Sequence, residues 1–401
     1  MAGILSRNLI LVAINQAIVS LGSAALIIIF AHFLGQALFG ELRYVVAVLA
    51  IFAFCSLPGI GLIINQNVVS MSATELRTLI RRQVEWSTVA VLGALMFALW
   101  HSLQGESDIA KAFAAGALLA PLANLFLMPG LICAGHSEFT RKTVLDALVI
   151  GSAVLGGLAG VLYAEHLYGI VFWYLGSQAI ATLCAFYLVR DKLFPTHETA
   201  TLPNLQDHLR EGVQLTLTQI PFQFIPAIEK VLIYIILGPV SLAIFVIAVL
   251  PIEHFKAAFR SLIQVYMLPH LTISSAYTTM HWLAVGLLVL SSGALLLVLF
   301  ILYGMAFFFA DYHEIMAFSL ALTLSLLPLP IHVIAVSWIA RRRLRTLTQF
   351  AGMSVLVNIL VIGGGAWMFG LWGAVVAKIV YEMVLATALV QLDRPSTYSP
   401  V

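Results

Sequence analysis

Residues 283–309 read LAVGLLVLSSGALLLVLFILYGMAFFF and contain no charged side chain. About 20 apolar residues in a helix cross the hydrocarbon core of a bilayer, so this stretch predicts a transmembrane helix. A strand of an outer-membrane barrel instead alternates apolar and polar residues over roughly ten positions. Only helices and closed barrels span membranes. The continuous run therefore favours the helical fold.

The composition of the whole chain supports a polytopic membrane protein. Hydrophobic residues make up 62% of the 401 residues and charged residues only 9%, whereas soluble domains carry about 25% charged residues. The net charge of +2 gives no reason to expect a nucleic-acid partner. Cys55, Cys133 and Cys184 are scattered through apolar runs, so we expect no disulfide framework and no metal site. Motifs for phosphate binding, zinc proteolysis or serine hydrolysis are absent, and we expect no cofactor.

Apolar runs of helical length predict twelve transmembrane helices. Their expected ranges are 8–34, 43–70, 83–101, 110–135, 143–164, 169–190, 212–237, 240–268, 282–309, 315–338, 346–368 and 371–391. The longest polar stretch, 190–211, lies near the middle of the chain. We therefore predict an N-terminal six-helix lobe (1–190), a cytoplasmic linker (191–211), a C-terminal six-helix lobe (212–391) and a cytoplasmic tail (392–401).

Basic residues predict the orientation of these helices, because Lys and Arg accumulate on the cytoplasmic side. The loops expected on one side, with the linker and both ends, carry Arg7, Arg77, Arg81, Arg82, Arg141, Lys142, Arg190, Lys192, Arg210, Arg341, Arg342, Arg343, Arg345 and Arg394. The loops on the other side carry only Arg43 and Lys111. Both termini are therefore predicted to be cytoplasmic.

Weak sequence similarities between the two halves suggest that the lobes are a tandem repeat. Leu34-Gly35 ends the first predicted helix and Leu237-Gly238 ends the seventh. Six helices per repeat give both lobes the same orientation, related by an axis along the membrane normal, and place the expected substrate path between them. Glycine is common at helix ends in any case.

Seven charged residues fall inside predicted helices of the second half. They are Glu229, Lys230, Glu253, Lys256, Arg260, Lys378 and Glu382. A charge at mid-bilayer costs at least about 2.5–3.5 kcal/mol, so such residues face water, a partner or a substrate. Helical spacing places Glu253, Lys256 and Arg260 on one face. We expect Glu253 to pair with Lys256 and Lys378 to pair with Glu382, and purely structural ion pairing remains an alternative role.

Neutral amides predominate inside the first half. Asn15, Gln16, Asn65 and Gln66 are the residues that we consider for glycan binding, because an amide both donates and accepts hydrogen bonds. Helix-to-helix hydrogen bonding is the alternative for each of them. Cations in one half and amides in the other fit a ligand with an anionic head and a sugar body.

Three segments of the chain resemble the polysaccharide flippases. They are AHFLGQALFGELRYVVAVLAIFAFCSLPGIGLIINQ (31–66), AIEKVLIYIILGPVSLAIFVIAVL (227–250) and VNILVIGGGAWMFGLWGAVVAKIVYEMV (357–384). Each is similar to a hairpin of that family, with Leu-Gly, Phe-Gly or Gly-Ala at its turn, and together they cover both halves. The chain thus resembles Wzx-type O-antigen and capsule flippases of the multidrug/oligosaccharidyl-lipid/polysaccharide (MOP) exporter superfamily.

This resemblance implies a multi-pass transporter of the bacterial inner membrane that works by alternating access. Its substrate would be an undecaprenyl-diphosphate-linked oligosaccharide, moved from the cytoplasmic to the periplasmic leaflet for O-antigen, capsule or exopolysaccharide synthesis. Membrane lipids, a polysaccharide polymerase and a chain-length regulator would be its partners. On charge and depth alone, we expect Arg260, Lys256, Lys230 and Lys378 to hold the diphosphate and Glu229 and Glu253 to couple transport to an ion.

Two other functions remain open from the sequence. An ion-coupled small-molecule antiporter of the same superfamily would need an acidic residue in the first half, where Asp146 stands beside Arg141 and Lys142 at an expected membrane edge. A membrane polysaccharide polymerase or ligase would need a reactive site on a sizeable external loop. The external loops predicted here are short, so we expect a transporter and not an enzyme.

Overall fold

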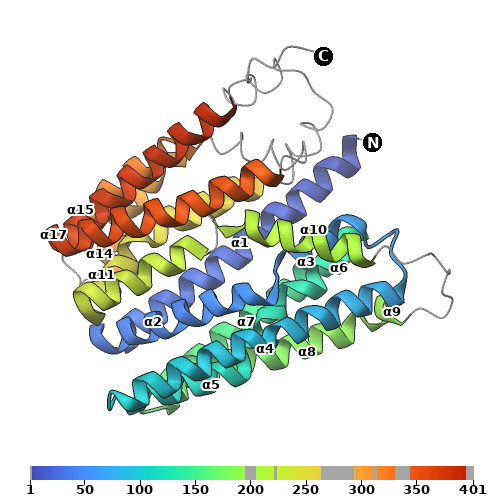
Figure 1. The fold of residues 1–401 in the computed structure, drawn as a ribbon, viewed down its shortest axis with the longest axis horizontal. Coiled ribbons are helices and arrows are strands. Elements are labelled where there is room, and N and C mark those ends of the chain that lie inside the picture. The colour runs from blue at the N-terminus through green and yellow to red at the C-terminus, as the bar shows by residue number, and fades with distance from the viewer. Residues whose placement is uncertain are drawn as a thin grey trace. The chain divides into compact units, whose positions relative to one another are not determined.

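The computed structural model describes residues 2–194, 205–220, 224–262, 293–294, 296–309, 314–329 and 344–393. Every regular element in these ranges is a helix, and eight of the helices are long and apolar enough to cross a membrane (Figure 1). The prediction of an all-helical polytopic membrane protein is confirmed. The count of twelve stays a prediction, because spans 282–309 and 315–338 lie partly outside the described residues. The cytoplasmic location of both termini also stays a prediction.

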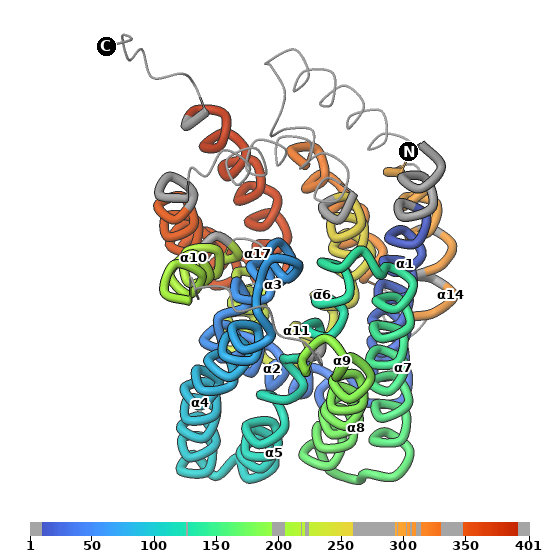
Figure 2. The backbone as a smooth tube through the Cα atoms, turned by 90° about the vertical axis from the view of Figure 1, so that its right-hand side faces the viewer, coloured from blue at the N-terminus to red at the C-terminus, as the bar shows by residue number. Residues whose placement is uncertain are grey.

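The chain divides into two compact units, Met1–Tyr234 and Ile235–Val401. The described residues of unit 1 contain ten α-helices and two short 3-10 turns ahead of α11 (Ile225–Leu262). They are α1 (Ala2–Phe33), α2 (Gln36–Ala53), η1 (Phe54–Ser56), α3 (Gly59–Asn67), α4 (Ala73–Leu103), α5 (Ser107–Asn124), η2 (Leu125–Leu127), α6 (Met128–Gly135), α7 (Phe139–Tyr163), α8 (Leu167–Leu188), α9 (Arg190–Leu193) and α10 (Leu205–Thr218). Helix α7 packs against α1 and α8, and α5 packs against α4 and α8, as Figure 2 shows.

Two predicted spans of unit 1 are broken helices. The second, expected at 43–70, begins earlier at Gln36 and is interrupted after η1, where Leu57 adopts a left-handed conformation (φ 57°) ahead of Pro58. Arg43 and Glu41, which we expected in an external loop, therefore lie within α2. The fourth, expected at 110–135, is split by η2 between α5 and α6. Proline weakens backbone hydrogen bonding at such places.

The segment between the two predicted lobes contains helices. Helix α9 lies at the start of this segment, and α10 begins within it and ends at Thr218. Helix α11 begins at Ile225, and residues 221–223 between the two helices lie outside the described residues. Helix α10 packs against α3 (Figures 1 and 2). Gly59 donates its backbone N–H to Thr216 Oγ1 at 2.9 Å, which anchors the contact.

Helix α11 (Ile225–Leu262) begins in unit 1 and continues into unit 2. At 1.5 Å per residue its 38 residues would extend about 57 Å, roughly twice the hydrocarbon thickness. Gly238 interrupts it with φ 85° and ψ 178°, a conformation that suits glycine alone. The sequence predicts a turn between two spans at this residue, and the structure confirms the break.

Further elements in the described residues of unit 2 are η5 (a π-helical turn, Ile301–Met305), α14 (Ala306–Phe308), α15 (Ile315–Leu322), η6 (Thr323–Leu326) and α17 (Leu344–Asp393). Helix α17 is broken at Gly370 (φ 63°), between two predicted spans. A Cβ at Gly365 would lie 2.6 Å from the carbonyl oxygen of Gly373. The two halves of α17 therefore touch backbone to backbone across the turn.

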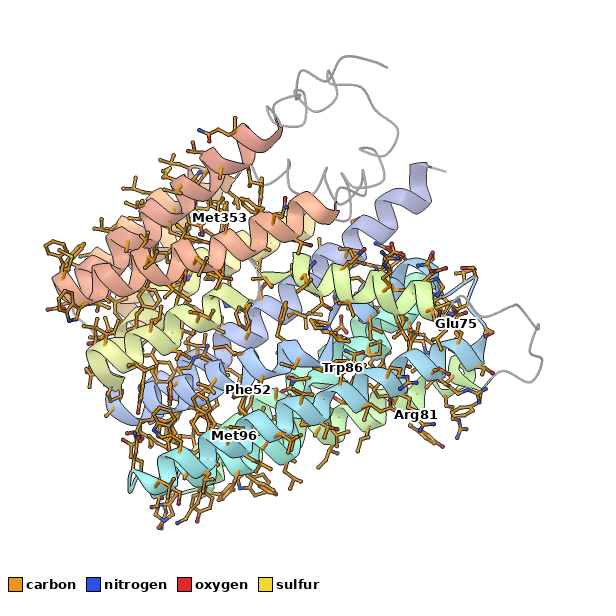
Figure 3. All side chains as sticks on the ribbon, in the orientation of Figure 1. Phe52, Glu75, Arg81, Trp86, Met96 and Met353 are labelled. Atoms are coloured by element: carbon orange, nitrogen blue, oxygen red, sulfur yellow. The ribbon has the colours of Figure 1, made fainter. Side chains whose placement is uncertain are left out.

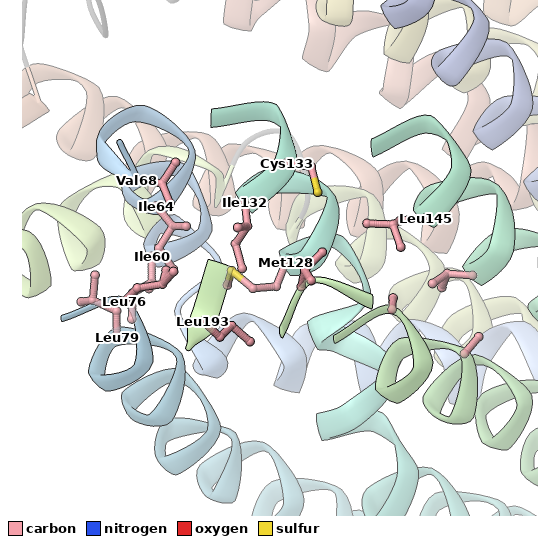
Figure 4. Packing of buried hydrophobic residues seen from close by; sticks show 14 residues of the cluster. Ile60, Ile64, Val68, Leu76, Leu79, Met128, Ile132, Cys133, Leu145 and Leu193 are labelled. Carbon is pink, nitrogen blue, oxygen red and sulfur yellow. The ribbon is translucent and has the colours of Figure 1, made fainter. Parts of the chain in front are cut away.

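The side chains show the burial pattern expected of a protein surrounded by lipid. A buried cluster in unit 1 joins Ile60 and Ile64 of α3, Leu79 of α4 and Ile132 of α6 (Figure 4). Large apolar side chains also point outward, such as Met96 of α4, which is 72% exposed (Figure 3). Such a surface is costly in water and favourable in hydrocarbon.

Candidate substrate and coupling sites

Four charged side chains of unit 2 form two ion pairs between α11 and α17. Lys256 Nζ lies 2.6 Å from Glu382 Oε1, and Lys378 Nζ lies 3.3 Å from Glu253 Oε1. Each helix thus contributes one lysine and one glutamate, and the pairs cross between the helices. The sequence did not predict these contacts between helices, and the expected pairing within each helix stays a prediction. We call these residues the charge quartet.

The charge quartet is buried and electrically neutral. The side chains of Lys378, Lys256 and Glu382 are 2%, 4% and 11% exposed, whereas Glu253 is 28% exposed. Removing four charges from water is costly, and the pairing offsets much of that cost. The two lysines that we expected to hold a diphosphate are therefore neutralised by carboxylates in this structure.

The structure describes the other three predicted charges, Glu229, Lys230 and Arg260, in less detail. Glu229 is 2% exposed on the first part of α11, and its neighbour Lys230 is half-buried. Arg260 lies in the last turns of α11, but its side chain falls outside the described residues. The roles proposed for these residues stay predictions.

The four amides of unit 1 differ in their surroundings. Gln16 donates to Ser20 Oγ on its own helix at 3.2 Å. Asn65 is half-buried and Gln66 is exposed at the end of α3. Asn15 is buried and donates from Nδ2 to Asp146 Oδ2 at 3.0 Å, which joins α1 to α7.

Asp146 is a buried acid that the sequence placed at the membrane edge. Its side chain is 4% exposed and contacts Lys142 Nζ, one turn earlier on α7. Arg141 turns elsewhere, toward Asp191 Oδ1 at 2.8 Å and Glu138 Oε2 at 3.3 Å. Asp146 is therefore buried between helices of unit 1, although it lies close to these basic residues in the sequence.

Arg43 is a cation that sequence reasoning missed. Its Nε atom is buried and, within the described part of the chain, has no hydrogen-bond partner. Tyr174 of α8 is close enough to interact with it electrostatically. The position of Arg43 between two runs of apolar residues looked like a loop, and only the earlier start of α2 reveals a helical arginine.

A second group missed by sequence reasoning lies at the end of α4. His101 Nδ1 contacts Glu106 Oε2 at 2.5 Å, and its Nε2 lies 3.1 Å from the hydroxyl of Tyr44. The Tyr44 ring stacks on Tyr234 of α11, with centroids 3.9 Å apart and planes 8° apart. Glu106 lies in a loop, so no helical spacing links it to His101 in the sequence. Among the described residues, no cluster of His, Cys, Asp and Glu could hold a metal ion.

Comparison with known proteins agrees with this architecture. Residues 5–279 match the family described as polysaccharide biosynthesis protein. No curated protein matches the chain in sequence.

Several solved structures share the fold. The inward-facing conformation of a multidrug resistance MATE family transporter of the MOP superfamily is similar, with a TM-score of 0.67 and 13% identity over 96% of this chain and 100% of that one. An outward-facing conformation of such a transporter gives a TM-score of 0.60 at 14% identity, covering 98% and 97%. A MOP superfamily transporter from Pyrococcus furiosus, described by a binding pocket of reverse polarity, gives 0.55 at 13% identity, covering 97% and 95%. These likenesses show the fold.

Proposed function

Because the chain belongs to the polysaccharide biosynthesis protein family, within the MOP superfamily of transporters, we propose that it is a flippase for lipid-linked oligosaccharides. Its cargo is a glycan repeat unit on undecaprenyl diphosphate, which it carries from the cytoplasmic to the periplasmic leaflet of the bacterial inner membrane. The glycan then enters O-antigen, capsule or exopolysaccharide, through a polymerase and a chain-length regulator.

The charge quartet carries this proposal. Lys256 and Lys378 are buried beside Glu382 and Glu253, and a diphosphate has oxygens that can replace the two carboxylates as their partners. The exchange keeps each lysine neutralised but frees the two carboxylates, so Glu253 and Glu382 must take up a proton or a coupling cation when the cargo enters. Arg260, which lies in unit 2 on the same helix as Lys256, would add further phosphate contacts, since Arg can bond two oxygens at once. A role of Lys230 in cargo binding stays a prediction from its charge.

The roles of the other predicted residues follow from their placement. Asn65 and Gln66 remain the candidates for hydrogen bonds to sugar hydroxyls, while Asn15 and Gln16 bond to neighbouring side chains. Glu253 is the most exposed member of the quartet, which suits a carboxylate that releases its lysine first. Glu229 and Glu253 would then bind the coupling ion.

A paired substitution tests the proposal without leaving a buried charge. Replacing a buried ion pair by apolar side chains of similar size is often neutral for stability, so Lys256→Met with Glu382→Met should fold. We expect this protein in proteoliposomes to lose movement of a fluorescent undecaprenyl-diphosphate-linked oligosaccharide, measured as exposure to an impermeant glycan-cleaving reagent. The control is Arg81→Gln, at an exposed position of α4, which should keep full movement of the lipid-linked oligosaccharide. Undiminished movement by the paired variant would refute a role for the quartet.

Arg43 provides a further test of an anionic cargo. Its Nε atom is buried and has no hydrogen-bond partner among the described residues, so an anion bound there would gain a charge-assisted bond. We expect Arg43→Gln to slow transport of the diphosphate-linked glycan at least tenfold and to change the melting temperature little. An equal rate would exclude Arg43 from cargo binding.

A proton-coupled exporter of small molecules is a second candidate, favoured by one observation. Asp146 is an acid buried between the helices of unit 1, and such a function needs an acid in the first half. The test is proton-driven accumulation of ethidium by everted vesicles. Accumulation that is lost in Asp146→Asn vesicles and unaffected by lipid-linked glycan would support the exporter over the flippase.

A further inference from the structure

Two buried acceptor oxygens lie on side chains that touch each other in unit 1. Lys142 and the Asn15 amide both direct their donors to Asp146 Oδ2. Asp146 Oδ1 and Asn15 Oδ1 are buried and, within the described ranges, have no hydrogen-bond partner. Asp146 is 5% exposed and Asn15 is 8% exposed. Two donors thus converge on one oxygen, while two acceptors nearby receive none.

Such an arrangement is rare in native proteins and calls for a physical reason. A buried acceptor without a donor costs about 1–3 kcal/mol, and these groups usually mark a function or a bound species. A proton on the carboxyl group would add a hydrogen-bond donor to this pair of side chains, because a protonated acid carries an O–H group. The amide oxygen of Asn15 is an acceptor already present on the contacting side chain.

Asp146 Oδ1 packs closely against α6. Gly130 of α6 faces this atom, and a Cβ at that position would overlap it. Glycine thus permits this close approach, which a side chain on α6 would prevent. The Asn15 contact holds the carboxyl group from the opposite helix, α1.

Lys142 is a counter-ion that can leave. Its side chain is 19% exposed, compared with 4% for Asp146, and it lies in the first turn of α7. A lysine stem at a helix end can extend toward water while its neighbour stays buried. The carboxylate can therefore be neutralised either by Lys142 or by a proton, and burial disfavours a state with neither.

The other charges around this end of α7 are engaged with one another. Arg141 contacts Asp191 and Glu138, and Lys192 contacts Glu138 at 2.5 Å. The helices packed against α7 also carry His32, Cys133, Tyr168, Tyr174, Cys184 and Tyr187. In the described part of the chain, the side-chain hydrogen bonds of Asp146 run to Asn15 and Lys142.

We propose that Asp146 is a proton-exchange site of the transport cycle, at which a proton replaces Lys142 as the partner of the carboxylate. Asn15 positions the carboxyl group, and its Oδ1 accepts the hydrogen bond that the protonated oxygen donates, while Gly130 permits the close approach of α6. The site concerns the ion that drives transport and not the cargo, so it goes beyond the proposed function. It is separate from Glu229 and Glu253, which lie on α11.

Infrared difference spectroscopy on the purified full-length protein tests the proposal without any glycan. When the pH is lowered from about 8 to about 3, through the range in which carboxyl groups ordinarily titrate, we expect a protonated-carboxyl band that Asp146→Asn abolishes. Removing an adjacent opposite charge changes carboxyl protonation by about tenfold or more, so Lys142→Gln should enlarge the band at neutral pH. Gly130→Ala should diminish it. Asp191→Asn, at an exposed acid, is the matched control and should leave the band in place.

A transport readout separates this site from the proposed cargo. In proteoliposomes, Asp146→Asn should lose the response of transport to a pH gradient, while melting curves confirm that the variant is folded. The proposal is overturned if the band is missing from the parent protein, if it persists in Asp146→Asn, or if sodium chloride substitutes for protons where choline chloride does not. None of these results depends on which molecule is carried.

Discussion

Removing one member of the charge quartet should destabilise unit 2 far more than removing a whole pair. In Lys256→Met, Glu382 loses a partner at 2.6 Å while only 11% exposed. Breaking a buried pair in this way costs about 3–5 kcal/mol. In the double variant with Glu382→Met, both desolvation costs disappear together, and the free energy of unfolding should return to within about 1 kcal/mol of the parent value.

The second pair provides an internal comparison. Lys378 lies 3.3 Å from Glu253, which is 28% exposed and so retains some hydration. We therefore expect Lys378→Met to destabilise the protein clearly less than Lys256→Met does. The distances and exposures of the two pairs, not the residue types, predict this order.

Equilibrium unfolding in mixed micelles of increasing dodecyl sulfate content, followed by circular dichroism, measures these differences. A double-mutant cycle on Lys256 and Glu382 should give a coupling free energy above about 1.5 kcal/mol. Additive single effects would contradict the crossed pairing. Equal losses for Lys256→Met and Lys378→Met would contradict the argument from exposure.

Two further predictions concern other parts of the fold. Gly373→Ala places a methyl group against the carbonyl oxygen of Gly365 and should cost about 1–3 kcal/mol in unfolding experiments, whereas Gly363→Ala, which meets no atom within 4 Å, should cost little. A hydrogen bond from Arg141 holds the pKa of Asp191 below its ordinary value; the stability it gives is present above about pH 4 and is lost as the pH falls through the lowered pKa. Melting temperatures from pH 7 to pH 3 should therefore fall more steeply for the parent than for Arg141→Gln, and parallel curves would count against the contact.

The general fold was predictable because it depends on composition. Long apolar runs and scarce charges leave lipid as the only suitable surroundings, and the breaks at Gly238 and Gly370 confirm two of the predicted turns. Helix starts were less predictable. Polar residues such as Glu41 and Arg43 look like a loop in the sequence, yet α2 includes them because its other faces are buried by neighbouring helices.

The ion pairs show why a candidate site is harder to predict than a fold. Spacing correctly placed Glu253 and Lys256 on one face of a helix, but it does not show which helix lies opposite. Lys378 and Glu382 lie more than 120 residues later, yet they form ion pairs with residues of α11. The contact of Asn15 with Asp146, separated by 131 residues, has no local signal at all.

The contact between α3 and α10 has a consequence for how the protein is made. Gly59 and Thr216 are 157 residues apart, and ribosomes add about 5–20 residues per second, so roughly 8–30 s separate their synthesis. Helix α3 must wait for that time beside the insertion machinery without the helix that covers Gly59. A ribosome that stalls between residues 67 and 205 would leave a nascent chain with this glycine face open, and such a chain is a natural substrate for membrane quality control.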